Sequence, residues 1–358
     1  MRHDPVIHLG TREISISAPT YFIADIASNH DGDLERAKSL IHVAKEAGAD
    51  AVKFQHFKAE KIVSDRGFRD LGRQASHQAN WERSVFETYR QYECNREWSH
   101  ALVDTARSAG IDFLTTPYDV EAVEALDEHL PAYKVGSGDI TWSEFLAFLA
   151  QRGKPVFLAT GAASMAEVER AVDVILKVNP RIVIMQCNTN YEGSAENFRF
   201  VNLRVLSTYA TRYPGMLLGL SDHTPRHAAV LGAIALGARV VEKHLTDDNG
   251  RKGPDHPFSM NPSSWREMIE RSRELEMALG DGLKRVEANE KETAVLQQRC
   301  LRLVADLPEG HVLESGDLEA LRPAPDGAVK PFDLETLVGR RLVLAFPRGH
   351  AVRPEDLE

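Results

Sequence analysis

Two histidines, His223 and His244, each follow a short apolar run and stand on consecutive runs of the chain. Imidazole nitrogens are common ligands of divalent metal ions. Two histidines leave further coordination positions open, which suits an ion that polarises a carbonyl group. Neighbouring strands lie about 4.8 Å apart, so histidines at the ends of two adjacent strands can reach one ion. The pair therefore predicts a divalent metal site, whereas either histidine alone would be interpreted as a hydrogen-bonded structural residue.

Two lysines, Lys53 and Lys134, occur within apolar runs, where lysine is rarely found without a partner. Together they predict a cationic pocket for phosphate and carboxylate groups. The glycines of Gly136-Ser137-Gly138 and of Thr160-Gly161 leave backbone N–H groups free to approach the same anion. Two alternatives stay open. In the first, one lysine extends to solvent and the other pairs with a carboxylate; in the second, one of them is a Schiff-base nucleophile, as in class I aldolases.

Eight short apolar runs place these residues, and each is followed by polar side chains and a stretch with helical periodicity. The runs cover residues 21–27, 51–55, 112–115, 132–135, 155–159, 182–187, 216–220 and 238–242. Eight strand–helix units over about 260 residues are typical of an α/β protein with a (β/α)8 TIM barrel, whose catalytic residues come from the carboxyl ends of the strands. A doubly wound sheet is the rival, but it usually has fewer parallel strands. We therefore expect a barrel over residues 1–280.

Residues 56–96 form an unusually long connection between the second strand and its helix. The stretch from Ser76 to Trp81, followed by a short helical pattern, predicts an active-site lid. The alternative is a surface excursion without a role.

The end of the chain contains an internal repeat. Leu307-Pro308-Glu309-Gly310-His311 and Phe346-Pro347-Arg348-Gly349-His350 both continue to an Asp-Leu pair. Proline followed by a glycine that can adopt positive φ marks the same tight turn twice. We expect a linker over residues 281–298 and a small, turn-rich β domain over residues 299–358.

The formal net charge of -10 argues against a nucleic-acid-binding protein. Only three cysteines occur, which excludes a disulfide framework and is typical of the cytoplasm. No apolar stretch has the length of a signal peptide core or a membrane span, so no membrane partner is expected.

Several of these segments together resemble the sialic acid (nonulosonic acid) synthase family. The resemblance is carried, in collinear order, by residues 23–32, Val52-Lys53-Phe54-Gln55, Thr116-Pro117, residues 133–139, residues 219–224, Glu242-Lys243-His244, Gly253-Pro254-Asp255 and Ser259-Met260. The C-terminal repeat with Leu321-Arg322-Pro323 is similar to the antifreeze-like (SAF) domain of that family.

The resemblance implies a transferase that condenses phosphoenolpyruvate with an open-chain N-acetylated aldose, giving a nine-carbon 2-keto acid and phosphate. It implies Mn²⁺ or Mg²⁺ on His223 and His244, and a domain-swapped homodimer in which Arg322 reaches the sugar in the partner's site. The residues implied for phosphoenolpyruvate are Lys53, Thr116, Lys134, Ser137, Thr189 and Ser221. Those implied for the sugar, besides Arg322, are Gln55, Tyr191 and Asp255. The catalytic residues implied are Asp25, Lys53, Lys134 and Asp139.

The chain departs from the family pattern at Asp25 and Asp139, where the family has glutamates, and at Ala159, where it has a serine. N-acetylmannosamine, a 2,4-diacetamido-trideoxy hexose and mannose therefore stay open as acceptors. The competing functions are another phosphoenolpyruvate-dependent aldose synthase and a Schiff-base aldolase.

Overall fold

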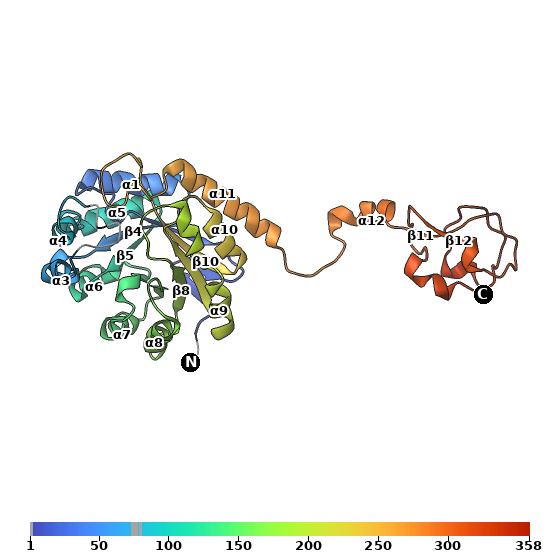
Figure 1. Cartoon of the computed structure of the whole chain (residues 1–358), viewed down its shortest axis with the longest axis horizontal. Coiled ribbons are helices and arrows are strands. Elements are labelled where there is room, and N and C mark those ends of the chain that lie inside the picture. Colours follow the sequence, from blue (N-terminus) through green and yellow to red (C-terminus); the bar gives the residue numbers. More distant parts are fainter. Residues whose placement is uncertain (1–2, 73–77, 79–80) are drawn as a thin grey trace. The chain divides into compact units, whose positions relative to one another are not determined.

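The computed structural model describes residues 3–72, 78 and 81–358. It divides into two compact units, Met1–Gly280 and Asp281–Glu358, which are described separately (Figure 1).

The first unit is built on eight parallel strands in the order β5-β4-β3-β10-β9-β8-β7-β6. They are β3 (Tyr21–Asp25), β4 (Ala51–His56), β5 (Asp112–Pro117), β6 (Tyr133–Val135), β7 (Val156–Ala159), β8 (Ile182–Cys187), β9 (Leu217–Asp222) and β10 (Ala238–His244). The two ends of this order, β5 and β6, lie against each other, so the sheet is a nearly closed barrel. The predicted (β/α)8 barrel is confirmed.

Helices follow the strands and surround the barrel, as Figure 1 shows. They are α1 (Leu34–Glu46), α5 (Ser99–Ala109), α6 (Val120–Leu126), α7 (Ser143–Gln151), α8 (Met165–Leu176), α9 (Val205–Arg212), α10 (Ala228–Ala235) and α11 (Pro262–Leu279). Local chemistry sets their starts: the Asp33 side chain accepts a hydrogen bond from the Arg36 amide at α1, and Ser164 and Glu167 form a capping box at α8. In the described part of the chain, no helix combines the length and the apolar character that a membrane span requires.

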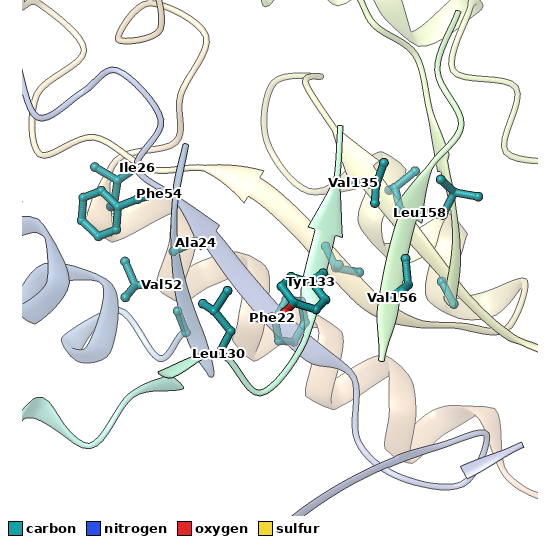
Figure 2. Close-up of a cluster of buried hydrophobic side chains, with 14 of the residues drawn as sticks. Phe22, Ala24, Ile26, Val52, Phe54, Leu130, Tyr133, Val135, Val156 and Leu158 are labelled. Atoms are coloured by element: carbon teal, nitrogen blue, oxygen red, sulfur yellow. The ribbon is translucent and has the colours of Figure 1, made fainter. Parts of the chain in front are cut away.

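Alternate residues of each strand point to opposite faces of the barrel wall. Phe22 and Ala24 of β3, Val52 and Phe54 of β4, and their counterparts on β6 and β7 belong to the cluster packed beneath the helices (Figure 2). The intervening residues, such as Tyr21, Ile23 and Phe157, form a second cluster inside the barrel.

A β-hairpin that the sequence patterns did not predict contributes to this inner cluster. It consists of β1 (Val6–Leu9) and β2 (Arg12–Ser15), which pair antiparallel. Ile7, Leu9 and Ile14 are buried with the inward-facing residues at the amino-terminal ends of the barrel strands. The hairpin therefore fills one end of the barrel with apolar side chains, and the polar residues lie at the other.

The long connection after β4 contains three short helices, α2 (Ala59–Ile62), α3 (Asp65–Asp70) and α4 (Val85–Gln91). The Glu93 carboxylate fixes the beginning of this connection. It accepts hydrogen bonds from Lys58 Nζ at 2.8 Å and from the Ala59 amide at 2.7 Å. Of the predicted lid stretch from Ser76 to Trp81, only Gln78 and Trp81 are among the described residues.

The second unit begins with irregular chain and α12 (Lys291–Gln297) and continues with the antiparallel pair β11 (Cys300–Leu303) and β12 (Leu318–Leu321). The Ala324 amide donates to the Val295 carbonyl at 2.8 Å, so α12 is hydrogen-bonded to the small domain.

The internal repeat of the second unit is also a structural repeat. Leu307 and Phe346 exchange two backbone hydrogen bonds of 3.0 Å. Each repeat histidine stands six positions before its aspartate. His311–Asp317 and His350–Asp356 make the same side-chain contact, at 2.8 and 2.7 Å. The two copies therefore use one local pattern of turn and hydrogen bond.

Candidate active site

The polar residues predicted at the strand ends point into the barrel, as the inner apolar cluster does. They lie nearer to the carboxyl end of each strand than the apolar residues. Asp25 lies opposite Lys53, and His244 lies opposite Asp25, in the register of the sheet. Glu242 lies opposite Ser221, and Gln55 lies opposite Thr116. The two-residue alternation of the strands thus turns a hydrophobic interior into a polar pocket at one end of the barrel.

Lys53 is fully enclosed in this pocket. Its Nζ lies 2.8 Å from Asp25 Oδ2 and donates a hydrogen bond of 3.0 Å to Thr116 Oγ1. Burial by itself lowers the pKa of Lys53, but the carboxylates of Asp25 and Glu242 outweigh burial and raise that pKa. Lys53 is therefore a permanent cation, as the anion-pocket interpretation requires.

Lys134 comes from β6, which flanks β5 on the side opposite to β4, and it meets the same carboxylate as Lys53. Lys134 Nζ lies 3.6 Å from Glu242 Oε1, and Lys53 Nζ lies 3.8 Å from that oxygen. Ser221 Oγ donates to it at 3.3 Å. The structure thus brings the two predicted lysines together around Glu242, a residue that the sequence analysis did not select as a site residue.

The signal for Glu242 was present in the strand alternation. Val240, Glu242 and His244 share the inward face of β10, whereas Lys243 points outward and pairs with Asp222 at 2.6 Å. The alternation of side chains along β10 thus places Glu242 and His244 in the pocket and Lys243 in a structural ion pair outside it.

A second group of predicted anion ligands surrounds Gly161. The Gly161 amide donates a hydrogen bond of 2.9 Å to Ser137 Oγ. A Cβ atom at position 161 would lie 2.0 Å from Thr189 Oγ1 and 2.9 Å from Ser137 Oγ. Glycine is therefore required sterically where these two hydroxyls converge beside the amide.

The two predicted metal-binding histidines face each other, with ring centroids 5.3 Å apart. His223 Nδ1 lies 3.0 Å from the Asn188 carbonyl oxygen. His244 Nδ1 is buried and has no hydrogen-bond partner within the described residues. Burial lowers the pKa of His244 to about 3, so its ring is neutral, the form that binds a metal ion.

These two side chains fit a divalent ion as a pair of ligands only. Within the described ranges, no group of three or more His, Cys, Asp or Glu side chains is arranged to hold a metal ion. The remaining coordination positions would belong to water and substrate, as in open catalytic sites.

The Cys187 thiol, which the sequence analysis did not select as a site residue, is hydrogen-bonded to the side chain of His223. Burial by itself raises the pKa of Cys187, but the hydrogen bond and charge of His223, a hydrogen bond with Ser137 and the charge of Lys134 together outweigh burial and lower that pKa. The same contact raises the pKa of His223 against the opposing effect of burial. β8 and β9 are neighbours in the sheet, which explains the contact.

The two carboxylates predicted as catalytic lie in different surroundings. Asp25 has partners on both oxygens: Oδ2 lies near Lys53 and Gln55, and Oδ1 accepts from the Ala27 amide at 3.0 Å. Asp139 Oδ2 is buried without a hydrogen-bond partner among the described residues. Burial raises the pKa of Asp139 to about 6, against the opposing charge of Lys134. Asp139 can therefore gain and lose a proton near neutral pH.

Three of the four residues predicted for the sugar, Gln55, Tyr191 and Asp255, lie at the mouth of the pocket. Gln55 Nε2 donates to Asp25 Oδ2 at 3.0 Å. Asp255 Oδ2 accepts hydrogen bonds from the Ser28 amide at 3.0 Å and hydroxyl at 2.6 Å. The Tyr191 ring lies 4.3 Å from the His223 ring, between centroids. Arg322 is an exposed residue of the second unit, directly after β12.

Aromatic side chains that the sequence analysis did not select surround this mouth. Phe258 lies 5.6 Å from Tyr191, and Phe57 lies 5.4 Å from Tyr89 of α4, between ring centroids. Burial, and then the charges of Asp255 and Asp139, raise the pKa of Tyr89, so its hydroxyl lies within electrostatic reach of both carboxylates. The long connection after β4 therefore contributes directly to the mouth of the pocket.

The comparisons with known proteins agree with this geometry. The model of the NeuB family matches residues 40–284, and the model of the SAF domain matches residues 298–358. The chain is 32% identical to N,N'-diacetyllegionaminic acid synthase of Legionella pneumophila, over 98% of each chain. It is 34% identical to the Campylobacter jejuni enzyme of that name, over 93% of this chain and 99% of the relative.

A solved structure is also similar. N-acetylneuraminic acid synthetase from Leptospira borgpetersenii superposes with a TM-score of 0.71 at 27% identity, covering 82% of this chain and 96% of that one. The fold and the pocket define a TIM-barrel enzyme that handles anionic substrates. The chain belongs to the NeuB family of nonulosonic acid synthases and carries a C-terminal SAF domain.

Proposed function

We propose that this protein condenses phosphoenolpyruvate with an unphosphorylated, N-acetylated aldose to form a nine-carbon 2-keto acid and inorganic phosphate. The observation that carries the proposal is the convergence of Lys53 and Lys134 on one buried point, beside the hydroxyls of Thr116 and Ser221. A substrate that carries a phosphate and a carboxylate on one carbon matches two fixed cations and several neutral donors. The raised pKa of Lys53 opposes the Schiff-base alternative, which needs a lysine that deprotonates readily.

The bond changes of this reaction set the tasks of the side chains. C3 of phosphoenolpyruvate forms a bond to the aldehyde carbon, whose oxygen takes up a proton. Water adds to C2 and loses one proton, which leaves a hydroxyl group on C2. That hydroxyl loses its own proton as the C2=O bond forms and the bond from C2 to the phosphate oxygen breaks, which releases inorganic phosphate. Lys53 and Lys134 hold the anionic groups throughout, and Asp139, with its pKa of about 6, can exchange a proton with the reacting atoms.

We propose His223 and His244 as the protein ligands of Mn²⁺ or Mg²⁺. A divalent ion bound there would supply Lewis-acid activation of the aldehyde. The contact of His223 Nδ1 with the Asn188 carbonyl fixes the ring that would face the ion. The buried, unpartnered His244 Nδ1 supports the same assignment.

The mouth of the pocket favours an uncharged acceptor. Asp255 accepts hydrogen bonds from Ser28 and has no basic ion-pair partner among the residues that the structure describes. A carboxylate binds sugar hydroxyls but repels an acceptor phosphate. Tyr89, Tyr191 and Phe258 offer ring faces to the less polar side of a sugar. With relatives that are named as N,N'-diacetyllegionaminic acid synthases, this favours a 2,4-diacetamido-trideoxy hexose.

An acceptor panel tests the proposal. N-acetylmannosamine, N-acetylmannosamine 6-phosphate, 2,4-diacetamido-2,4,6-trideoxy hexoses and mannose would each be incubated with phosphoenolpyruvate and Mn²⁺. The mass of each keto-acid product would then be measured. We expect the highest kcat/KM with an unphosphorylated acetamido sugar. Exclusive use of the 6-phosphate would contradict the acceptor assignment and leave the donor assignment standing.

We also propose that the enzyme acts in the cytoplasm as a homodimer in which Arg322 completes the partner's site. Arg322 is exposed and has no hydrogen bond or ion pair within the described residues, which supports a role outside its own domain. Co-expression of Arg322→Ala with Lys53→Met tests this, because mixed dimers would contain one intact site. We expect about a quarter of the wild-type activity from an equal mixture of two inactive variants. No recovery in isolated mixed dimers would contradict the swapped arrangement.

A further inference from the structure

Glu242 places a negative charge inside a pocket whose proposed ligands are anions. Its Oε1 lies 3.6 Å from Lys134 Nζ, 3.8 Å from Lys53 Nζ and 3.3 Å from Ser221 Oγ. Its Oε2 is buried and has no hydrogen-bond partner in the described part of the chain. All four side chains are at least nine-tenths buried.

Two carboxylates therefore balance the two lysines before any ligand arrives. Asp25 and Glu242 offset the charges of Lys53 and Lys134. Lys53 has a close partner in Asp25, at 2.8 Å. For Lys134, Glu242 is the only carboxylate within ion-pair distance among the residues described.

We propose that Glu242 is a built-in counter-ion that competes with phosphate for Lys134 and Lys53 and so allows the phosphate product to leave. This inference rests on the proposed function, because it requires an anionic substrate in the pocket. Without Glu242, Lys134 would have no counter-ion and would bind the substrate and the released phosphate equally tightly, and such uniform binding does not accelerate turnover. Glu242 is thus a positioning residue that holds the lysines in place and limits the affinity of the empty pocket for anions.

Glu242→Gln tests the proposal, because the amide keeps the size and the contact with Ser221 but removes the charge. The dissociation constant of inorganic phosphate would be measured by calorimetry on the full chain. The phosphate inhibition constant and kcat would be measured during turnover with Mn²⁺. Glu121→Gln is the matched control, since Glu121 pairs with Lys61 at 2.8 Å on the exposed surface.

We expect Glu242→Gln to bind phosphate roughly tenfold more tightly and to turn over more slowly, with phosphate release limiting kcat. Glu121→Gln should match the wild type in both respects. A residue with a merely structural role would weaken phosphate binding when replaced, so the direction of the change distinguishes the two roles. Unchanged or weaker phosphate binding by a folded Glu242→Gln variant would overturn the proposal.

A second variant keeps the test decisive if Glu242→Gln is unstable. Glu242→Asp retains the charge but withdraws it by one methylene, and we expect phosphate to bind about threefold more tightly than in the wild type. No tightening in this variant would equally overturn the inference. Failure of the proposed function would look different, because the wild-type protein itself would then bind neither phosphate nor phosphoenolpyruvate.

Discussion

The barrel mouth and the C-terminal unit both contain histidines and acidic residues, but they use them in opposite ways. In the C-terminal unit, His311 is paired with Asp317 and His350 with Asp356, each within one turn-forming repeat. In the barrel mouth, Glu242 Oε2, Asp139 Oδ2 and His244 Nδ1 are buried without a hydrogen-bond partner among the described residues.

This difference separates structural polar groups from those awaiting a ligand. A buried polar atom without a partner costs about 1–3 kcal/mol, so a protein rarely retains several of them at one place without a compensating function. The two His–Asp pairs of the repeat stabilise the folded state of the C-terminal unit. The unpaired atoms of the barrel mouth instead become useful only when substrate or metal is bound.

The largest effect that this comparison predicts is the loss of a site cation. Lys134→Met should lower kcat/KM for phosphoenolpyruvate by about a thousandfold or more, because a charge-assisted contact to the anion disappears. Lys61→Met, which removes a lysine from the exposed pair with Glu121, is the control and should leave kcat/KM unchanged. A similar fall in kcat/KM for Lys134→Met and Lys61→Met would contradict the distinction between ligand-binding and structural charged groups.

Gly161→Ala should have the next largest effect. The added methyl would have to displace Thr189 Oγ1 and Ser137 Oγ, which lie 2.0 and 2.9 Å from its position. We expect kcat/KM to fall about a hundredfold through misplacement of the anion ligands, mainly as a higher KM for phosphoenolpyruvate. Gly316→Ala in the C-terminal unit is the control, because a Cβ there would meet nothing within 4 Å. Equal steady-state constants for Gly161→Ala and the wild type would contradict the assigned anion site.

Asp139→Asn should separate activity from stability. The pKa of about 6, against an ordinary value of 3.8, means that the folded protein holds this proton more tightly than the unfolded chain. The contribution of Asp139 to stability therefore falls as pH rises through that interval, and at pH 7.5 its charge is a penalty.

The asparagine variant should accordingly be more stable than the wild type at pH 7.5, by about 1–2 kcal/mol, with the difference vanishing below pH 4. Its kcat should fall about a hundredfold, and the ionisation near pH 6 should disappear from the pH profile. Urea unfolding at the two pH values and pH-rate profiles measure both effects. Lower stability of the variant at pH 7.5 would show that Asp139 is paired after all.

The smallest effects should come from the paired histidines of the repeat. His311→Ala and His350→Ala each remove one side-chain hydrogen bond and should destabilise the C-terminal unit by about 1–2 kcal/mol. Phosphoenolpyruvate binding by the barrel should not change. Calorimetric unfolding of the full chain measures the first effect, and a changed dissociation constant for phosphoenolpyruvate would contradict the second.

The barrel strands were predictable because each is a short apolar run, and a strand buried on both faces needs no other signal. The strand-end residues followed from the same pattern, since the carboxyl ends of parallel strands meet at one edge. Lys53 and Lys134 could be assigned to one pocket on that ground alone.

What could not be predicted depends on side-chain direction and on contacts between distant segments. Glu242 stands in a triplet of polar residues, and its role emerges only once the inward face of β10 is known. The hairpin of β1 and β2 offers two short segments with three buried apolar residues, too few for a periodic signal. The contribution of Tyr89 depends on how α4 folds back over the strand ends, which no local spacing encodes.

The central claim is that the polar end of the barrel joins phosphoenolpyruvate to an aldose. The most direct measurement is phosphate release from phosphoenolpyruvate with and without a 2,4-diacetamido-trideoxy hexose, in Mn²⁺ and in EDTA, with the organic product weighed by mass spectrometry. We predict release only when aldose and metal are both present, with one keto acid formed per phosphate. Phosphate release at the same rate without the aldose, or consumption of the aldose without phosphate release, would contradict the account.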